Sequence, residues 1–161
     1  MDRFRRLTIA ASLSLALVGV PAMTLADTQV TYAVSGVEYA ATTTVGSFAG
    51  IAVAADDYGT WQATIAHSPL TTNPATITGG TFALNGKVRD LAGTFVTGSI
   101  TLLTTVTCGK QTYLVSGSLN VTAGGSGTAD FGAVLTHYRF CLWGHPITYA
   151  ATVKGSVLFH L

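Results

Sequence analysis

Two histidines, His67 and His137, are the side chains in this sequence best placed for chemistry. Each stands near the end of an alternating apolar pattern, and Arg139 lies on the same strand face as His137. If the strands form a barrel, these residues lie near its mouth. Imidazoles bind metal ions or small ligands and exchange protons near neutral pH. We therefore take His67, His137 and Arg139 as candidate ligand-binding residues.

A metal site at these histidines needs at least a third ligand. Side chains of a suitable type are present elsewhere in the sequence: Glu38, Asp57 and His145. No spacing in the sequence brings them together with the two histidines. We therefore predict no metal ion and no cofactor, and the competing interpretation is that His67 and His137 are rim residues with one satisfied nitrogen.

Aromatic side chains near turns indicate a different kind of site. Trp143 follows Cys141 closely, in a segment with turn-forming residues. Tyr138 lies shortly before Cys141 in the sequence. Exposed aromatic rings at such places bind carbohydrate, peptide or protein partners. The alternative is that the rings near strand ends close the barrel, a group made up of Tyr58, Trp61, Tyr138, Phe140 and Trp143. Tyr138 and Trp143 complete our set of candidates, for an unknown small molecule, carbohydrate or protein.

The motifs of common enzymes are missing from the sequence. It contains no Gly-x-Ser-x-Gly, His-Glu-x-x-His or Cys-x-x-Cys, and no predicted helix follows the glycine-rich segment 124–127 to bind a phosphate. The adjacent Asp56 and Asp57 fit a turn, where carboxylates bond to the backbone. We predict no catalytic residues, and a binding or structural role rather than an enzyme.

Strands rather than helices are expected to position these residues. Thr, Val and Gly are abundant after residue 26, and apolar and polar residues alternate, with Trp61, Ala63, Ile65 and His67 on one face. Asn85-Gly86 predicts a hairpin with a short return strand at 87–89, and 140–146 predicts a turn. The nearly continuous apolar run 48–55 predicts a strand buried on both faces or a membrane-like setting.

These patterns predict a single all-β domain. We expect about eight to nine antiparallel strands in a β-barrel or a β-sandwich. Long strands with glycine in mid-course favour the closed, coiled barrel.

The two cysteines in the chain, Cys108 and Cys141, flank a predicted strand–turn–strand segment whose turn is at 124–127. If the flanks pair, a disulfide closes the open end of this hairpin. One disulfide is the most economical state of two cysteines in an exported chain. The alternative is a pair of buried free thiols.

The first 26 residues are typical of a secretory signal peptide. Arg3, Arg5 and Arg6 precede an apolar run at 7–20, and small residues precede a cleavage point after Ala26. The alternative is a retained membrane anchor, which the Ser, Thr, Gly and Pro in this run disfavour. Cleavage leaves a domain at 27–161 in a secreted or periplasmic location.

Charge is sparse in this sequence. Charged residues make up 9% of it, and loss of three arginines and Asp2 with the leader changes the formal net charge from +1 to −1. This balance argues against nucleic acid and anionic membranes as partners. A surface of Thr, Ser, Gly and Ala leaves self-association open.

Three functions remain. The first is an exported non-enzymatic β-domain that binds a partner or has a structural role. The second is a small barrel, or an enzyme of that barrel type, with an apolar ligand in a cavity above about 300 Å³; its lining would include Phe95, Tyr113, Phe131 and Leu135. The third is a small outer-membrane β-barrel, because apolar residues alternate up to Leu161 at the terminus.

Overall fold

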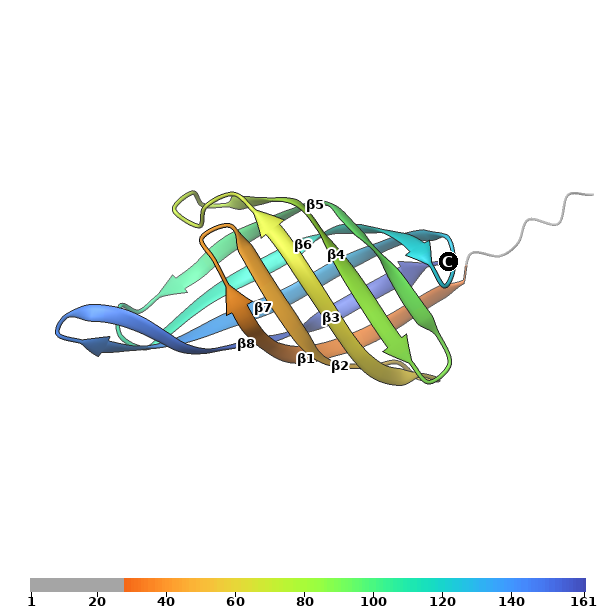
Figure 1. Ribbon diagram of the computed structural model, residues 1–161, viewed down its shortest axis with the longest axis horizontal. Coiled ribbons are helices and arrows are strands. Elements are labelled where there is room, and N and C mark those ends of the chain that lie inside the picture. Colours follow the sequence, from red (N-terminus) through yellow and green to blue (C-terminus); the bar gives the residue numbers. More distant parts are fainter. Residues whose placement is uncertain (1–27) are drawn as a thin grey trace, which may run out of the picture.

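Eight antiparallel strands close into a barrel in the computed structural model, which describes residues 28–161 (Figure 1). The predicted signal peptide, residues 1–26, lies outside the described residues. The strands are β1 (Gln29–Ala41), β2 (Val45–Val53), β3 (Tyr58–His67), β4 (Ala75–Gly86), β5 (Asp90–Thr105), β6 (Lys110–Ala123), β7 (Gly127–Leu142) and β8 (His145–His160). Within residues 28–161 no helix is long and apolar enough to cross a membrane.

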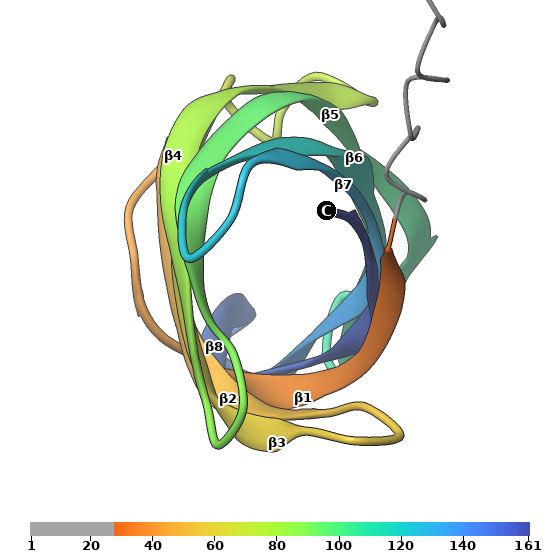
Figure 2. The same ribbon diagram turned by 90° about the vertical axis from the view of Figure 1, so that its right-hand side faces the viewer.

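The barrel is closed by pairing between its first and last strands. Each strand pairs with the next in sequence, and β8 pairs with β1 from Gln29 opposite His160 to Val37 opposite Thr152 (Figure 2). Outside the strands, Thr28 and Leu161 exchange two backbone hydrogen bonds of 2.9 and 3.0 Å. The all-β prediction is confirmed, and the structure selects the barrel over the sandwich.

Alternation along the strands produces the core. On β3, Ala63, Ile65 and His67 are buried on the inner face, as the sequence predicted, while the residues between them are more exposed. The core draws on all eight strands, with these largest members: Tyr32, Phe48, Ile65, Ile77, Leu84, Leu91, Phe95, Ile100, Tyr113, Leu119, Leu135 and Phe159. Burying each such side chain contributes about 1.5–3 kcal/mol to folding.

The prediction that the run 48–55 is buried on both faces is wrong. Phe48 and Ala52 are buried, but Ile51 and Val53 are 57% and 50% exposed. These two residues project from the outer face of the barrel because side chains alternate along β2. An apolar run therefore does not mark a doubly buried strand here.

Two turns lie elsewhere than predicted. Residues 87–89 are not a return strand but the turn between β4 and β5, closed by a 3.0 Å hydrogen bond from Gly86 N to Arg89 O. The predicted turn at 140–146 shrinks to Trp143 and Gly144, which have φ values of 50° and 82°. Short hairpin turns use such positive φ values, which suit glycine and strain a bulky residue such as Trp143.

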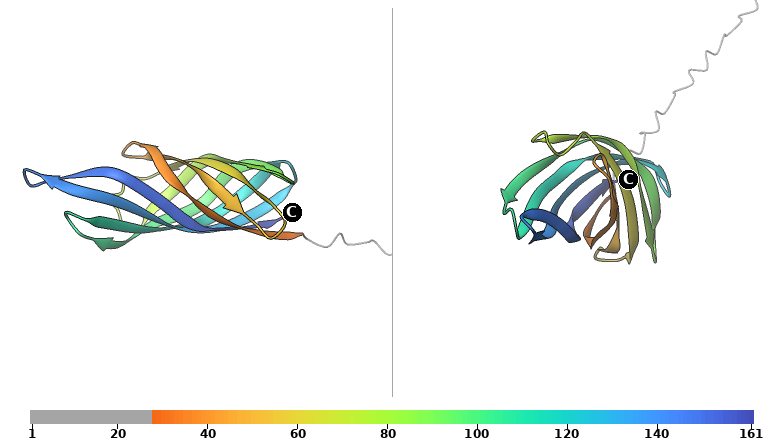
Figure 3. Two further views of the ribbon diagram at one scale, coloured as in Figure 1. Left: turned by 90° about the horizontal axis from the view of Figure 1, so that it is seen from below. Right: turned by 60° about the vertical axis from the view of Figure 1, so that its left-hand side comes forward.

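The two ends of the barrel differ. At one end, which we call the Asp57 end, lie the turns at 54–57, 87–89 and 124–126 together with Leu161. At the other, the disulfide end, β7 and β8 extend beyond the neighbouring strands as a long hairpin (Figure 3). The predicted bond between Cys108 and Cys141 is present there, with 5.3 Å between the Cα atoms. It ties the turn before β6 to the outer part of this hairpin, two residues before Trp143.

Candidate functional site

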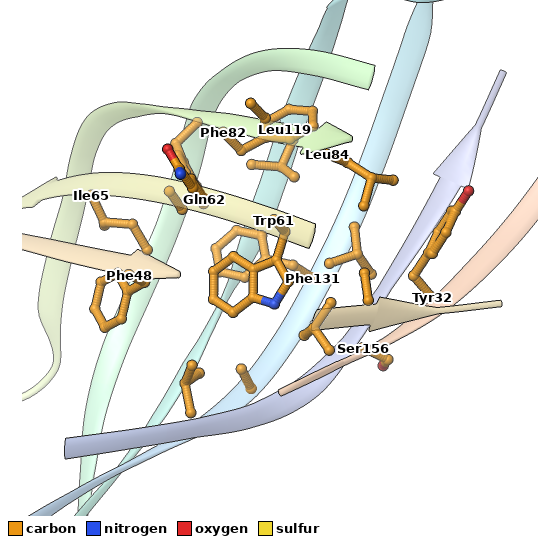
Figure 4. Close-up of a pocket in the computed structure, with 18 of the residues that line it drawn as sticks. Tyr32, Phe48, Trp61, Gln62, Ile65, Phe82, Leu84, Leu119, Phe131 and Ser156 are labelled. Atoms are coloured by element: carbon orange, nitrogen blue, oxygen red, sulfur yellow. The ribbon is translucent and has the colours of Figure 1, made fainter. Parts of the chain in front are cut away.

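An apolar cavity lies inside the barrel. Its volume is about 90 Å³, and Figure 4 shows Trp61 and Phe131 projecting into it. Aromatic rings dominate the lining: Phe48, Trp61, Phe82, Phe95, Phe131 and Phe159. The predicted cavity of more than about 300 Å³ is therefore wrong in size, because these rings fill most of the interior. Phe95 and Phe131 line the cavity as predicted, but Tyr113 and Leu135 do not.

Glycines give Trp61 its place against the wall of the barrel. Gly36 and Gly50 face each other across β1 and β2, and a Cβ atom on Gly36 would lie 2.9 Å from the indole ring. The indole Nε1 donates to the backbone oxygens of Ser35 and Ile51, at 3.2 and 3.1 Å. The alternation along the strand predicted Trp61 on the same face as Ala63, and Trp61 lines the interior; it does not close an end of the barrel. Its orientation is fixed by two neighbouring strands.

On the opposite wall, Phe131 also packs its ring against a glycine. It pairs in register with Gly117, whose Cβ atom, if present, would lie 2.9 Å from the Phe131 ring. Its ring meets Phe95 edge to face, at 5.2 Å between centroids and 88° between planes. Such edge-to-face pairs add about 0.5–1.5 kcal/mol beyond the apolar area they bury. The cavity thus has rigid aromatic walls.

A second, smaller space adjoins the cavity toward the disulfide end, and we call it the polar pocket. Its volume is about 50 Å³, and it shares Phe48, Ile65 and Val115 with the apolar cavity. Thr42 and Leu70, from the two nearby loops, also line it. Its ionisable lining residues are Glu38, His67 and His137. Two of the predicted site residues therefore meet at one pocket.

Glu38 and His137 are paired across the interior. The distance between His137 Nε2 and Glu38 Oε2 is 2.9 Å, and their side chains are 14% and 10% exposed, respectively. A carboxylate only accepts hydrogen bonds, so the proton lies on Nε2 of His137. The two residues lie on β7 and β1, which are separated by β8. Sequence reasoning named Glu38 as a possible partner but had no signal to place it there.

His67 is buried at the end of β3 and is held in one tautomer. Its Nδ1 donates to the backbone oxygen of Ser68 at 2.8 Å. In the neutral ring, Nε2 then carries only a lone pair. Within residues 28–161, neither this Nε2 nor Glu38 Oε1 has a hydrogen-bond partner. The polar pocket therefore has two hydrogen-bond acceptors to spare.

Further polar side chains surround the pair without lining the polar pocket. Arg139 Nη1 donates to Gln111 Oε1 at 2.8 Å, while the buried Nε of Arg139 has no acceptor among the described residues. The Tyr113 ring meets His137 edge-on, at 5.5 Å between centroids. Burial raises the pKa of Tyr113; the positive charge of Arg139 opposes this effect, and the negative charge of Glu38 adds to it. Arg139 thus acts at the margin of the pocket.

The remaining two candidates lie outside the barrel. Tyr138 lies beside Tyr149, at 6.4 Å between centroids, and beneath the ammonium group of Lys110 at 5.5 Å. Phe140 also meets Tyr149, at 6.0 Å. Trp143 is 91% exposed at the tip of the long hairpin. The five candidates therefore do not form one site: His67 and His137 line the polar pocket, Arg139 is nearby, and Tyr138 and Trp143 are external.

The Asp57 end is closed by a different network. Asp57 is buried and accepts four hydrogen bonds, from Tyr32 Oη at 2.6 Å and from the backbone nitrogens of Tyr58, Val88 and Arg89 at 2.8, 2.9 and 3.1 Å. The predicted turn bonding of this residue is confirmed. Asp56 is paired with Arg89 through two hydrogen bonds of 3.1 and 2.7 Å. Together they fasten the β2–β3 turn to the β4–β5 turn.

The pKa values at this end follow from that bonding. Burial pushes the pKa of Asp57 upward, but its hydrogen bonds outweigh burial and leave the pKa below the usual value. Burial first, and then the bond to Asp57, raise the pKa of Tyr32 to about 12. The bond from Arg89 lowers the pKa of Asp56 and raises that of Arg89. Each group is stabilised in the protonation state that it has near neutral pH.

The interior is suited to holding a compound. The polar pocket offers acceptors and a Glu–His pair that can exchange a proton, and the cavity beyond it offers aromatic surface. Among residues 28–161, no three His, Cys, Asp or Glu side chains are grouped as metal ligands. Comparisons of the chain with family models, curated proteins and solved structures found no match.

Proposed function

We propose that this protein binds a small, largely apolar compound inside its barrel, outside the cytoplasm. The observation that carries the proposal is the aromatic cavity of about 90 Å³ with a polar pocket beside it at the disulfide end. Ligand sites in proteins typically combine an apolar lining with a few polar groups that orient the ligand.

The volume limits the size of the compound. Dry apolar cavities of about 150 Å³ bind benzene in other proteins. Water gains little in such a place, since it needs about two to four polar partners. The cavity of about 90 Å³ and the neighbouring pocket of about 50 Å³ together approach the volume of such a benzene-binding cavity, so the compound is about as large as one small aromatic ring.

The location outside the cytoplasm is supported by the disulfide, and the apolar interior bears on whether the barrel faces water or lipid. Disulfides persist in oxidising compartments. On β6, buried Tyr113 and Val115 alternate with Thr112, Leu114 and Ser116 on the outer face, so that face is mixed, and Leu114 is 40% exposed. Outer-membrane barrels have an apolar outside and a polar inside. The apolar interior of this barrel differs from that pattern, which favours a barrel that faces water over the lipid-facing alternative.

The two tryptophans of the chain permit a direct test, since Trp61 lines the cavity and Trp143 is exposed. In a Trp143→Phe variant, all tryptophan fluorescence comes from Trp61. Bromine quenches this fluorescence at short range, so titration with 4-bromotoluene should give saturable quenching.

Two controls are needed. N-acetyltryptophanamide reports collisional quenching, which does not saturate. Adding Ala133→Leu, which enlarges a lining residue, should reduce the saturable part at least about tenfold. Quenching that stays linear in 4-bromotoluene for the Trp143→Phe protein would overturn the proposal.

A further inference from the structure

We infer that the polar pocket recognises an N–H or O–H donor, so that the compound bound in the interior is a small amphipathic alcohol or amine. This inference rests on the proposed function and specifies its ligand class. The spare acceptors described above carry it.

The first step is the count of free polar atoms in the pocket. Glu38 uses Oε2 for His137, which leaves Oε1; His67 uses Nδ1 for the Ser68 carbonyl, which leaves Nε2. Both side chains line the polar pocket. A carboxylate oxygen and the unprotonated nitrogen of a neutral imidazole accept hydrogen bonds and do not donate them. A ligand group that donates is therefore the complement of this pair.

The second step concerns competing head groups. A carbonyl compound would place its own lone pairs against the two acceptors and would leave them unsatisfied, which is costly in a buried site. A carboxylate would also meet the negative charge of Glu38. The guanidinium of Arg139 has one nitrogen bonded to Gln111 and a buried Nε without an acceptor among the described residues, but it does not line this pocket. Acceptor-only and anionic groups are thus disfavoured.

The third step is orientation. Phe48, Ile65 and Val115 line both spaces and therefore lie between them, so a compound that reaches past these side chains has its donor at Glu38 and His67 and its apolar end toward Trp61. Gly46 leaves room beside the carboxylate, because a Cβ atom at this position would lie 2.8 Å from Glu38 Oε1. A para-substituted benzene matches this division into two ends.

The experiment extends the fluorescence titration to compounds that differ only at one end. In the Trp143→Phe protein, 4-bromobenzyl alcohol and 4-bromobenzylamine carry donors, 4-bromobenzaldehyde carries only an acceptor, and 4-bromobenzoate is an anion. We expect the alcohol to bind about tenfold more tightly than the aldehyde, which has the same number of heavy atoms. The benzoate should bind most weakly. This comparison requires no change in the pocket.

Two further variants separate the alcohol from the amine. Glu38→Gln, which keeps the side-chain shape, should weaken the amine about tenfold, whereas His67→Phe should weaken the alcohol about tenfold. Binding of 4-bromotoluene, measured in the same variants, gives the reference against which each loss of alcohol or amine binding is expressed. Asp90→Asn removes an exposed acid from the other end of the barrel and serves as the matched control. Circular dichroism establishes that each variant is folded.

The outcomes distinguish the inference from the proposed function. If the aldehyde or the benzoate binds as tightly as the alcohol and the amine, the inference is wrong although the cavity still binds ligands. The inference would also be wrong if the folded Glu38→Gln and His67→Phe proteins bound the alcohol and the amine as tightly as the parent does. If none of the compounds, 4-bromotoluene included, quenches Trp61 saturably, the proposed function itself fails.

Discussion

Each end of this barrel contains a carboxylate withdrawn from water, and the two are bonded very differently. At the Asp57 end, both oxygens of Asp57 accept two hydrogen bonds each. At the disulfide end, Glu38 has one bond, to His137, and one free oxygen. A buried polar group is normally satisfied, and an unsatisfied one reduces stability.

The comparison distinguishes a carboxylate that stabilises the fold from one that is available to a ligand. Asp57 joins β1, through Tyr32, to two turns, so its hydrogen bonds stabilise the fold. Glu38 lines a pocket and keeps bonding capacity that a ligand can use. Changes at the Asp57 end should therefore reduce stability, and changes at Glu38 should chiefly alter binding.

The largest effect is expected from Asp57→Ala. This change leaves a tyrosine hydroxyl and three backbone N–H groups without their acceptor, so the free energy of unfolding should fall by about 3–5 kcal/mol. Urea denaturation followed by circular dichroism measures it. Asp56→Ala, which removes only the exposed ion pair with Arg89, should reduce the free energy of unfolding far less. Equal losses in the two variants would refute the distinction between these neighbours.

Reduction of the disulfide should have the next largest effect. Cys108 and Cys141 are separated by 33 positions, and a loop of this length corresponds to about 3–4 kcal/mol of stabilisation from chain entropy. A Cys108→Ser, Cys141→Ser double variant should melt at a lower temperature than the oxidised protein and should not respond to reductant. An oxidised protein whose melting temperature is unchanged by reductant would contradict the bond.

Tyr32→Phe and Tyr113→Phe compare how much a tyrosine hydroxyl contributes to stability at each end of the barrel. Loss of the Tyr32 bond to the Asp57 carboxylate should reduce stability by about 2 kcal/mol. Tyr113 has no hydrogen-bonded hydroxyl within residues 28–161, so its loss should change stability by less than about 0.5 kcal/mol. Urea denaturation of both variants measures the difference, and similar losses would argue against it.

The same tyrosine should make stability depend on alkaline pH. The pKa of Tyr32 is about 12 in the folded protein, above its ordinary value of about 10. Its contribution is therefore complete below about pH 10 and is lost as the pH rises toward about 12. Asp57 behaves in the opposite sense: its lowered pKa stabilises the fold above about pH 4, and this is lost as the pH falls. Urea denaturation across pH should show the alkaline loss reduced in Tyr32→Phe and the acid loss reduced in Asp57→Asn.

The smallest change in stability is expected for Glu38→Gln. The amide keeps the shape and one acceptor, so the free energy of unfolding should change by less than about 1 kcal/mol. Its effect on amine binding should be the larger one. A loss of stability as great as that of Asp57→Ala would mean that Glu38 is structural as well.

Much of the architecture follows from local patterns in the sequence. Alternation correctly placed Ala63, Ile65 and His67 inside the barrel, and cysteine spacing predicted the disulfide. The aromatic walls of the cavity were harder to predict from the sequence, because the position of Trp61 depends on glycines of the two preceding strands. Mid-strand glycines predicted coiling, but at Gly36 and Gly117 the missing side chain also makes room for a ring.

The polar pocket was only half predictable. His67 and His137 were recognisable by type and by their place at strand ends. Their meeting with Glu38 depends on closure of the barrel, which brings β1 and β7 to either side of β8. No local sequence pattern predicts that β1 and β8 pair to close the barrel. The alternative that the external rings close the barrel fails for Trp143 for a related reason: β7 and β8 run on past residue 140, which moves Trp143 away from the mouth.

The most direct test of a ligand-binding interior is a crystal structure of the protein soaked with 4-bromobenzyl alcohol, with bromine located from its anomalous scattering. Our account predicts a bromine peak in the apolar cavity between Trp61 and Phe131, with the hydroxyl group directed toward His67 and Glu38. Bromine found only on the outer surface, for example beside Trp143, with no peak inside the barrel, would contradict it.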